Sequence, residues 1–160
     1  MCYATVVQFA IRLLRQTFES VVRKGEVPPL PVMVPEELAK PEGGVYVAAY
    51  ENPGRMPRGR VGSYLPTKAS LAEEIQAQAV NLAHTYPFRK EDLAYLTYEL
   101  LLTRTPFLLA NITDLEPDMG LLVRLGHGRS AISLPGVQTR SPEERLREAW
   151  RQGGIDPAVE

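Results

Sequence analysis

A proline-rich segment near the N-terminal end most narrowly limits what this chain can fold into. Residues 26–44 contain five prolines, namely Pro28, Pro29, Pro31, Pro35 and Pro41. Because proline lacks an amide hydrogen and its ring clashes with the preceding turn, no long helix can cross this segment. We predict an extended connector or a small lobe there, with one short helical turn near residues 35–38. A chain of 160 residues is long enough for the flanking regions to share one domain spanning residues 1–160.

The segment before the prolines has the pattern of an amphipathic helix. Apolar side chains recur at helical spacing over residues 5–22, while arginines occupy the other face. Gln8, Arg12 and Glu19 interrupt this run well short of the roughly twenty apolar residues that a membrane span requires. Gly25 is a typical helix end. We therefore predict a helix packed on a core, and no membrane segment.

A glycine- and arginine-rich stretch, residues 54–64, follows a predicted strand at residues 45–50. The strand is rich in valine and tyrosine and is bounded by turn residues on both sides. The stretch after it contains three glycines and three arginines, and no acidic residue lies between Glu51 and Glu73. Glycine permits positive φ and close approach of a ligand, and amides in such turns can hold anions. We predict a loop with a local positive field.

The rest of the chain predicts further helices and strands. Capping boxes at residues 70–73 and 141–144 each predict the start of a helix. Residues 96–102 begin with β-type alternation, although their leucines and glutamate also favour a helix. Apolar runs at residues 120–125 and 129–134, joined by a glycine-flanked turn, predict a hairpin. The order of these elements predicts an α+β fold with a mainly antiparallel sheet flanked by helices.

Composition disfavours several classes of function. The single cysteine, Cys2, cannot form an internal disulfide and fits a reducing, cytoplasmic environment. With only His84 and His127 beside it, the chain has no metal-ligand spacing, and we expect neither a metal nor another cofactor. The formal net charge is −1. Nucleic-acid binding would therefore depend on the local positive field alone, and it is the least favoured partner class.

Taken in order, these segments resemble the AMMECR domain family. The similarity covers nearly the whole chain and includes the N-terminal helix, the Gly-Val-Tyr-Val strand, the glycine-rich motif, the first capped helix, and a Gly-Leu-Leu-Val strand paired with one ending in Leu-Pro-Gly-Val. The family's central motif, Leu-Arg-Gly-Cys-Ile-Gly, falls on residues 57–62. Both glycines and the arginine match, and valine replaces isoleucine. Pro57 stands in place of the leucine, and Arg60 in place of the cysteine.

This resemblance implies an α+β fold of two unequal lobes, with the sheet in the larger lobe and the motif facing a cleft between them. It implies no established activity. Family members in bacteria and archaea often accompany a Memo-type protein and a radical-SAM protein, which predicts protein partners from a shared pathway. Thiol chemistry at the motif is not expected, because Arg60 replaces the family's cysteine.

The residues that we predict to bind a ligand are Arg58, Gly59, Arg60, Gly62 and Glu99. A guanidinium offers a planar fork of donors to phosphate or carboxylate. If Glu99 faces inward from its strand, it requires a partner, and Arg58 is a candidate. The alternative is a solvated surface turn in which glycine serves only the backbone shape. His127 fits an exposed hairpin residue better than an acid or base.

Three hypotheses for function follow from the sequence. The first is a non-catalytic accessory module that binds a small anionic ligand or a partner protein through the glycine-arginine stretch; a homodimer stays open. The second is a cleft enzyme that uses Arg58 with a carboxylate such as Glu99 and needs no thiol. The third is a weak nucleic-acid binder. The missing cysteine favours the first over the second, and the net charge disfavours the third.

Overall fold

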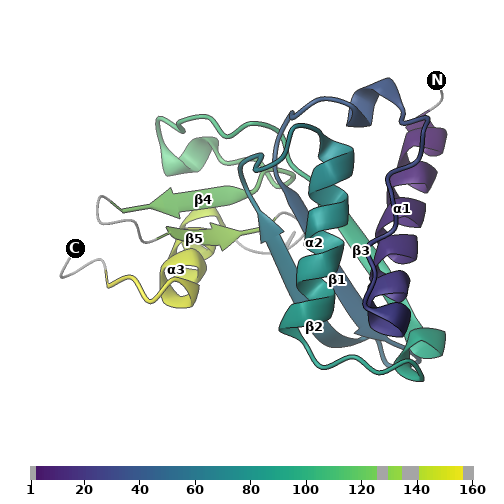
Figure 1. Cartoon of the computed structure of the whole chain (residues 1–160). Helices are drawn as coiled ribbons and strands as arrows, with labels where there is room; N and C mark the ends of the chain where they lie inside the picture. The colour runs from purple at the N-terminus through teal and green to yellow at the C-terminus, as the bar shows by residue number, and fades with distance from the viewer. Residues whose placement is uncertain (1–2, 126–129, 135–140, 157–160) are drawn as a thin grey trace. The chain divides into compact units, whose positions relative to one another are not determined.

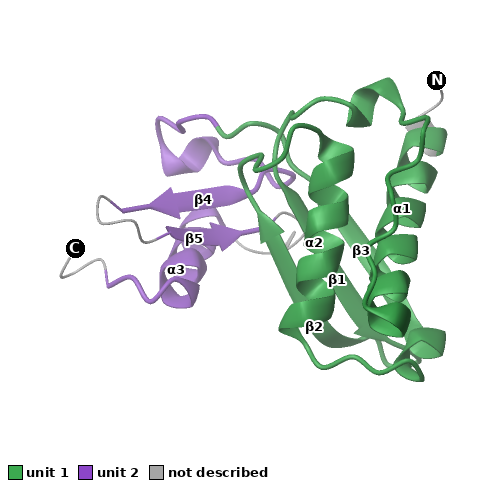
Figure 2. Cartoon of the chain, viewed as in Figure 1, with its two compact units in different colours: residues 1–106 green, residues 107–160 purple. Residues whose placement is uncertain are grey.

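The fold is known from a computed structural model of the whole chain. The structure describes residues 3–125, 130–134 and 141–156. The chain divides into two compact units, residues 1–106 and residues 107–160, which Figure 2 shows in different colours. The boundary is far from the proline-rich connector at residues 26–44, which belongs entirely to the first unit.

The first unit is a three-stranded antiparallel sheet with two helices on one of its faces (Figure 1). The helices are α1 (Tyr3–Lys24) and α2 (Leu71–Thr85), and the strands are β1 (Val45–Glu51), β2 (Met56–Ser63) and β3 (Leu96–Leu102). Two short 3-10 helices, η1 (Glu36–Leu38) and η2 (Asp92–Tyr95), lie in the connections. The strand order is β2-β1-β3, so β1 is central and pairs with both neighbours.

Both predicted helices of this unit are confirmed, and residues 96–102 form a strand rather than the competing helix. Gly25 ends α1 with a φ of +72°, and its amide donates to the carbonyl of Val21 at 2.8 Å. The Ser70 hydroxyl accepts from the amide of Glu73 at 3.2 Å, as the capping box predicts. The Glu73 carboxylate, however, accepts from the amide of Ala69 rather than from that of Ser70.

The connector is extended, as its prolines predict, and its helical turn is η1. Side chains tie it to the rest of the first unit. Leu38 is buried, and Leu30 and Val34 pack against the core. The side-chain amide of Gln76 on α2 donates from Nε2 to the backbone carbonyl of Pro28 at 2.7 Å. The connector is therefore a fixed part of this unit.

Strand β1 separates the core of the first unit from a second surface. Val45, Val47 and Ala49 are fully buried in the core with residues of α1 and α2. Because successive side chains of a strand point to opposite sides, Tyr46, Ala48 and Tyr50 point away from these helices. We call this second surface the opposite face of the sheet.

The predicted loop at residues 54–64 is mostly a strand, and that prediction was wrong. Met56–Ser63 form β2, which pairs along β1, and the connecting turn is confined to residues 52–55. Arg55 takes the positive φ of this turn, at 48°, whereas Gly54, Gly59 and Gly62 have no positive φ. Glycine and proline have a low propensity for strands, so it is the backbone pairing with β1 that holds the segment extended.

The second unit contains η3 (Ile112–Asp114), β4 (Leu121–Arg124), β5 (Ser130–Ser133) and α3 (Pro142–Gln152). Strands β4 and β5 form the predicted hairpin, while the turn with His127 lies outside the described residues. The capping box of α3 is confirmed by hydrogen bonds in both directions between Ser141 and Glu144. Helices and antiparallel sheets together confirm the α+β class. Among the described residues, no helix has the length and apolar character needed to cross a membrane.

Candidate ligand-binding site

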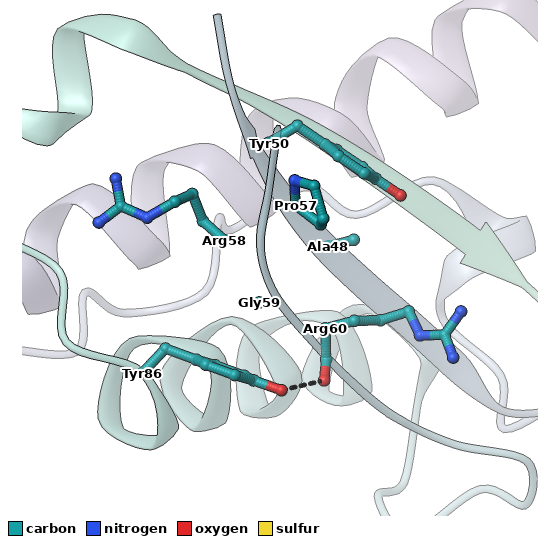
Figure 3. A pocket seen from close by; sticks show the side chains of 7 residues that line it. All are labelled: Ala48, Tyr50, Pro57, Arg58, Gly59, Arg60 and Tyr86. Atoms are coloured by element: carbon teal, nitrogen blue, oxygen red, sulfur yellow. Dashed lines mark hydrogen bonds between the residues drawn. The ribbon is translucent and has the colours of Figure 1, made fainter. Parts of the chain in front are cut away.

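A β-bulge separates the two arginines of the central motif. The register of β1 against β2 shifts just before Tyr50, which pairs with Pro57, so Arg58 has no directly paired residue on β1. Bulges of this kind redirect side chains. In Figure 3 the side chains of Arg58 and Arg60 point in opposite directions. The two arginines therefore have different surroundings.

Arg58 is held by two carboxylates and an aromatic ring. It donates from Nη1 to the Glu51 carboxylate and from Nη2 to Oδ2 of Asp92 at 3.3 Å, and its guanidinium carbon lies 5.7 Å from the ring centre of Phe88. The hydrogen bond with Glu51 raises the pKa of Arg58. The pKa of Asp92 is lowered, first by the amide of Arg89 and then by the charge of Arg58. These contacts make Arg58 a structural ion-pair partner.

Glu99 pairs with Arg55, so the predicted pairing of Glu99 with Arg58 is wrong. Oε2 of Glu99 lies 2.6 Å from Nη2 of Arg55, whose guanidinium carbon is 4.9 Å from the ring centre of Tyr50. The physical reason is the pleat of the sheet: Glu99 is directly paired with Ala48 and shares the opposite face with it, whereas Arg58 binds Glu51. The Arg55–Glu99 pair is exposed, at 68% and 51% for the two side chains, so it is a weak contact.

The two motif glycines make room for tyrosine rings. A Cβ on Gly59 would stand 2.5 Å from Cδ2 of Tyr86, and a Cβ on Gly62 would stand 2.4 Å from Cδ1 of Tyr46. Real Cβ atoms essentially never come so close to a ring, so any side chain there would displace it. From the sequence, the alternative to ligand binding was that these glycines serve the shape of the backbone. The actual requirement is close packing, of the Tyr86 ring against Gly59 and of the Tyr46 ring and the Val45 carbonyl against Gly62.

A pocket of about 350 Å³ lies at the bulge (Figure 3). Its lining comes from β1, β2 and the residue that ends α2, and consists of Ala48, Tyr50, Pro57, Arg58, Gly59, Arg60 and Tyr86. The pocket thus brings together three of the five predicted ligand-binding residues. Gly62 lies further along β2, and Glu99 lies on β3 beside Ala48.

Arg60 provides the available positive charge at this pocket. Its side chain is exposed and, among the residues that the structure describes, no carboxylate pairs with it, in contrast to Arg55 and Arg58. Its backbone carbonyl accepts a hydrogen bond from the hydroxyl of Tyr86 at 3.1 Å, which fixes β2 at this point. Burial raises the pKa of the neighbouring Tyr46, and the positive charge of Arg60 opposes that shift. Of the two arginines that line the pocket, Arg60 is thus the one without an ion pair to any described residue.

Sequence reasoning missed Glu74, a buried carboxylate close to the end of β2. Glu74 is 1% exposed and accepts hydrogen bonds from the Ser63 hydroxyl at 2.9 Å, the Thr67 amide at 2.8 Å, the Lys68 amide at 3.0 Å and the Gln78 side chain at 3.0 Å. Burial raises its pKa, but the hydrogen bonds outweigh burial and the net pKa is lowered. Glu74 therefore anchors the segment between β2 and α2. The signal in the sequence that could have pointed to Glu74 is its position directly after the capping box at residues 70–73.

Comparisons with known proteins agree with this architecture. The AMMECR1 family model matches residues 11–160. A protein from Thermotoga maritima is 31% identical over 154 residues, which cover 93% of this chain and 86% of that protein. The crystal structure of an uncharacterised protein from Pyrococcus horikoshii is similar with a TM-score of 0.82 and 25% identity, over 93% of this chain and 80% of that one. The match to the family model covers nearly the whole sequence, and the chain therefore belongs to the AMMECR1 family.

Proposed function

We propose that this protein is a non-catalytic accessory module that binds a small anionic ligand at the pocket beside Arg60. One observation carries the proposal: the Arg60 guanidinium is exposed at a pocket and has no carboxylate partner among the described residues. A guanidinium that is not already paired can bind an anion without first breaking an internal ion pair.

The surroundings of Arg60 support this assignment of the anion site. Arg58, the other motif arginine in the pocket, is already bound by Glu51 and Asp92. The Tyr86 hydroxyl holds the Arg60 backbone, so the side chain extends from a fixed point. The enzyme hypothesis used Arg58 with a carboxylate such as Glu99, but Glu99 binds Arg55, and the carboxylates that bind Arg58 are those of Glu51 and Asp92.

The experiment that tests the proposal is an NMR titration of the protein with acetate and with inorganic phosphate at low ionic strength. We expect saturable shifts at the amides of Ala48, Gly59 and Arg60, and a loss of affinity of about five- to tenfold in Arg60→Ala. Arg12→Ala is the matched control, because Arg12 is an exposed arginine on α1. Equal binding by Arg60→Ala and the wild type, or no saturable shift, would overturn the proposal.

The same module is proposed to work in the cytoplasm with protein partners. The single cysteine supports a reducing compartment. The family resemblance supports Memo-type and radical-SAM proteins as partners in a shared pathway. Co-purification of such proteins from the native cells, tested with the wild type and with Arg60→Ala, measures whether these partners bind and whether they use the pocket. Recovery of neither protein with the wild type would count against both partners.

A further inference from the structure

Three residues form a row across the sheet, with opposite charges at its two ends. Ala48 on β1 pairs directly with Arg60 on β2 and with Glu99 on β3. Directly paired residues in antiparallel strands share a face, so all three lie on the opposite face. Neighbouring strands lie about 4.8 Å apart, which places the outer two backbones about 10 Å apart. A cation and an anion thus flank a small side chain.

Two tyrosines border the same row along the central strand. Tyr46 and Tyr50 are the residues two before and two after Ala48, so their side chains share its face. In Figure 3 the side chains of Tyr50 and Arg60 extend in the same direction. Ala48 has only a methyl group and is 4% exposed, so its neighbours largely cover it, and it lines the pocket together with Tyr50 and Arg60. The row thus runs from the pocket, at Arg60, to Glu99 on the neighbouring strand β3.

Arg55 already shows what Glu99 can bind. Its guanidinium lies 2.6 Å from the Glu99 carboxylate and over the ring of Tyr50. It therefore occupies the position that a cationic group of a ligand would take. Both side chains are more than half exposed, and exposed pairs of this kind exchange readily with competing ions. A ligand's ammonium group can displace Arg55 without disturbing the core.

We propose that the ligand is a small zwitterion, whose carboxylate binds Arg60 and whose ammonium group binds Glu99 in place of Arg55. This inference rests on the proposed function, since it requires Arg60 to be the anion site. To the proposed function it adds a second charged group on the ligand and a distance between the ligand's two charges. A ligand bound at both ends spans the methyl group of Ala48.

The test compares amino acids with the matched acids that lack an amine. The probes are 4-aminobutyrate against butyrate, and 6-aminohexanoate against hexanoate, titrated by NMR into the full chain at low ionic strength. We expect the amino acid of a matching length to bind about fivefold or more tightly than its acid, because an ammonium–carboxylate contact is added. Glu99→Gln should remove this difference while leaving the affinity for the acid within about twofold.

Two further variants separate the possible results. Glu37→Gln is the control for Glu99→Gln, because Glu37 is an exposed glutamate outside the sheet. Arg55→Asn removes the competing cation at a position of positive φ that asparagine tolerates, and should tighten amino-acid binding about two- to fivefold. Acids that bind through Arg60 with no gain from the amine would overturn the zwitterion and leave the proposed function standing. Absence of any Arg60-dependent binding would overturn both.

Discussion

Gly59 lies directly against the ring of Tyr86, so closely that a Cβ at position 59 would stand 2.5 Å from Cδ2 of that ring. The hydroxyl of the same tyrosine donates a hydrogen bond to the backbone carbonyl of Arg60 at 3.1 Å. Tyr86 is also the residue that ends α2. This contact therefore joins the end of the helix to the strand that carries the pocket, and it requires glycine whatever the pocket binds.

Gly59→Ala should lower the free energy of unfolding by about 1–3 kcal/mol, because the added methyl group must displace a packed ring. Gly54→Ala is the matched control: its Cβ would meet its nearest neighbour, Cγ of Met56, at an ordinary 3.5 Å. We expect that control to stay within about 0.5 kcal/mol of the wild type. Urea denaturation measures both variants, and equal losses would contradict the role assigned to Tyr86.

Arg58→Ala should affect stability and Arg60→Ala should affect anion binding, although the two arginines are only two residues apart. Arg58 binds Glu51 and Asp92 and lies over Phe88, so its removal should lower the melting temperature by about 2–6 °C. Arg60→Ala should leave the melting temperature unchanged and weaken anion binding. Differential scanning calorimetry and the acetate titration, run on both variants, provide the two measurements. A stable Arg58→Ala variant with impaired binding would reverse these assignments.

The sequence predicted those elements whose signals are local. The apolar periodicity of α1, the prolines of the connector and the hydroxyl of Ser141 each act within a few residues, and the structure confirms the elements they predict. Strand β2 could not be predicted in this way, because its pairing with β1 holds it extended.

The surroundings of the site residues also could not be predicted from the sequence. The directions of Arg58 and Arg60 depend on a one-residue shift in register, which no local pattern encodes. Glu99 pairs with Arg55, and not with Arg58 as predicted, because of the face of the sheet on which its side chain lies. Glu74 has an ordinary acidic position in the first turn of a helix, and only the fold shows that it is buried.

Glu74 should make the stability depend on pH on the acid side. Its folded pKa is lowered, so its contribution is complete above the unfolded value, about 4.3, and is lost as the pH falls through the folded pKa. Glu74→Gln replaces an acceptor oxygen by a donor amide among several donors, and should cost about 2–3 kcal/mol at pH 7. Its unfolding free energy should also fall less steeply below about pH 5 than that of the wild type.

Urea denaturation at a series of pH values tests this prediction, with Glu37→Gln as an exposed control. Some acid dependence should remain in Glu74→Gln, because the amide of Arg89 also lowers the pKa of Asp92. A Glu74→Gln profile parallel to that of the wild type would show that Glu74 does not titrate differently in the folded and unfolded chains.

Arg145 should stabilise the second unit in particular. It is 4% exposed, and its guanidinium donates to the backbone carbonyls of Glu116, at 3.1 Å, and of Met119. Burial lowers its pKa. Arg145→Met keeps much of the apolar packing but leaves both carbonyls without these donors, at a cost of about 2–4 kcal/mol.

Hydrogen exchange measures where this stability is lost. We expect Arg145→Met to exchange faster in β4 and α3 and at an unchanged rate in α1 and α2, whereas the exposed control Arg147→Met should exchange like the wild type. Uniform acceleration throughout the chain would instead show that Arg145 stabilises both units together.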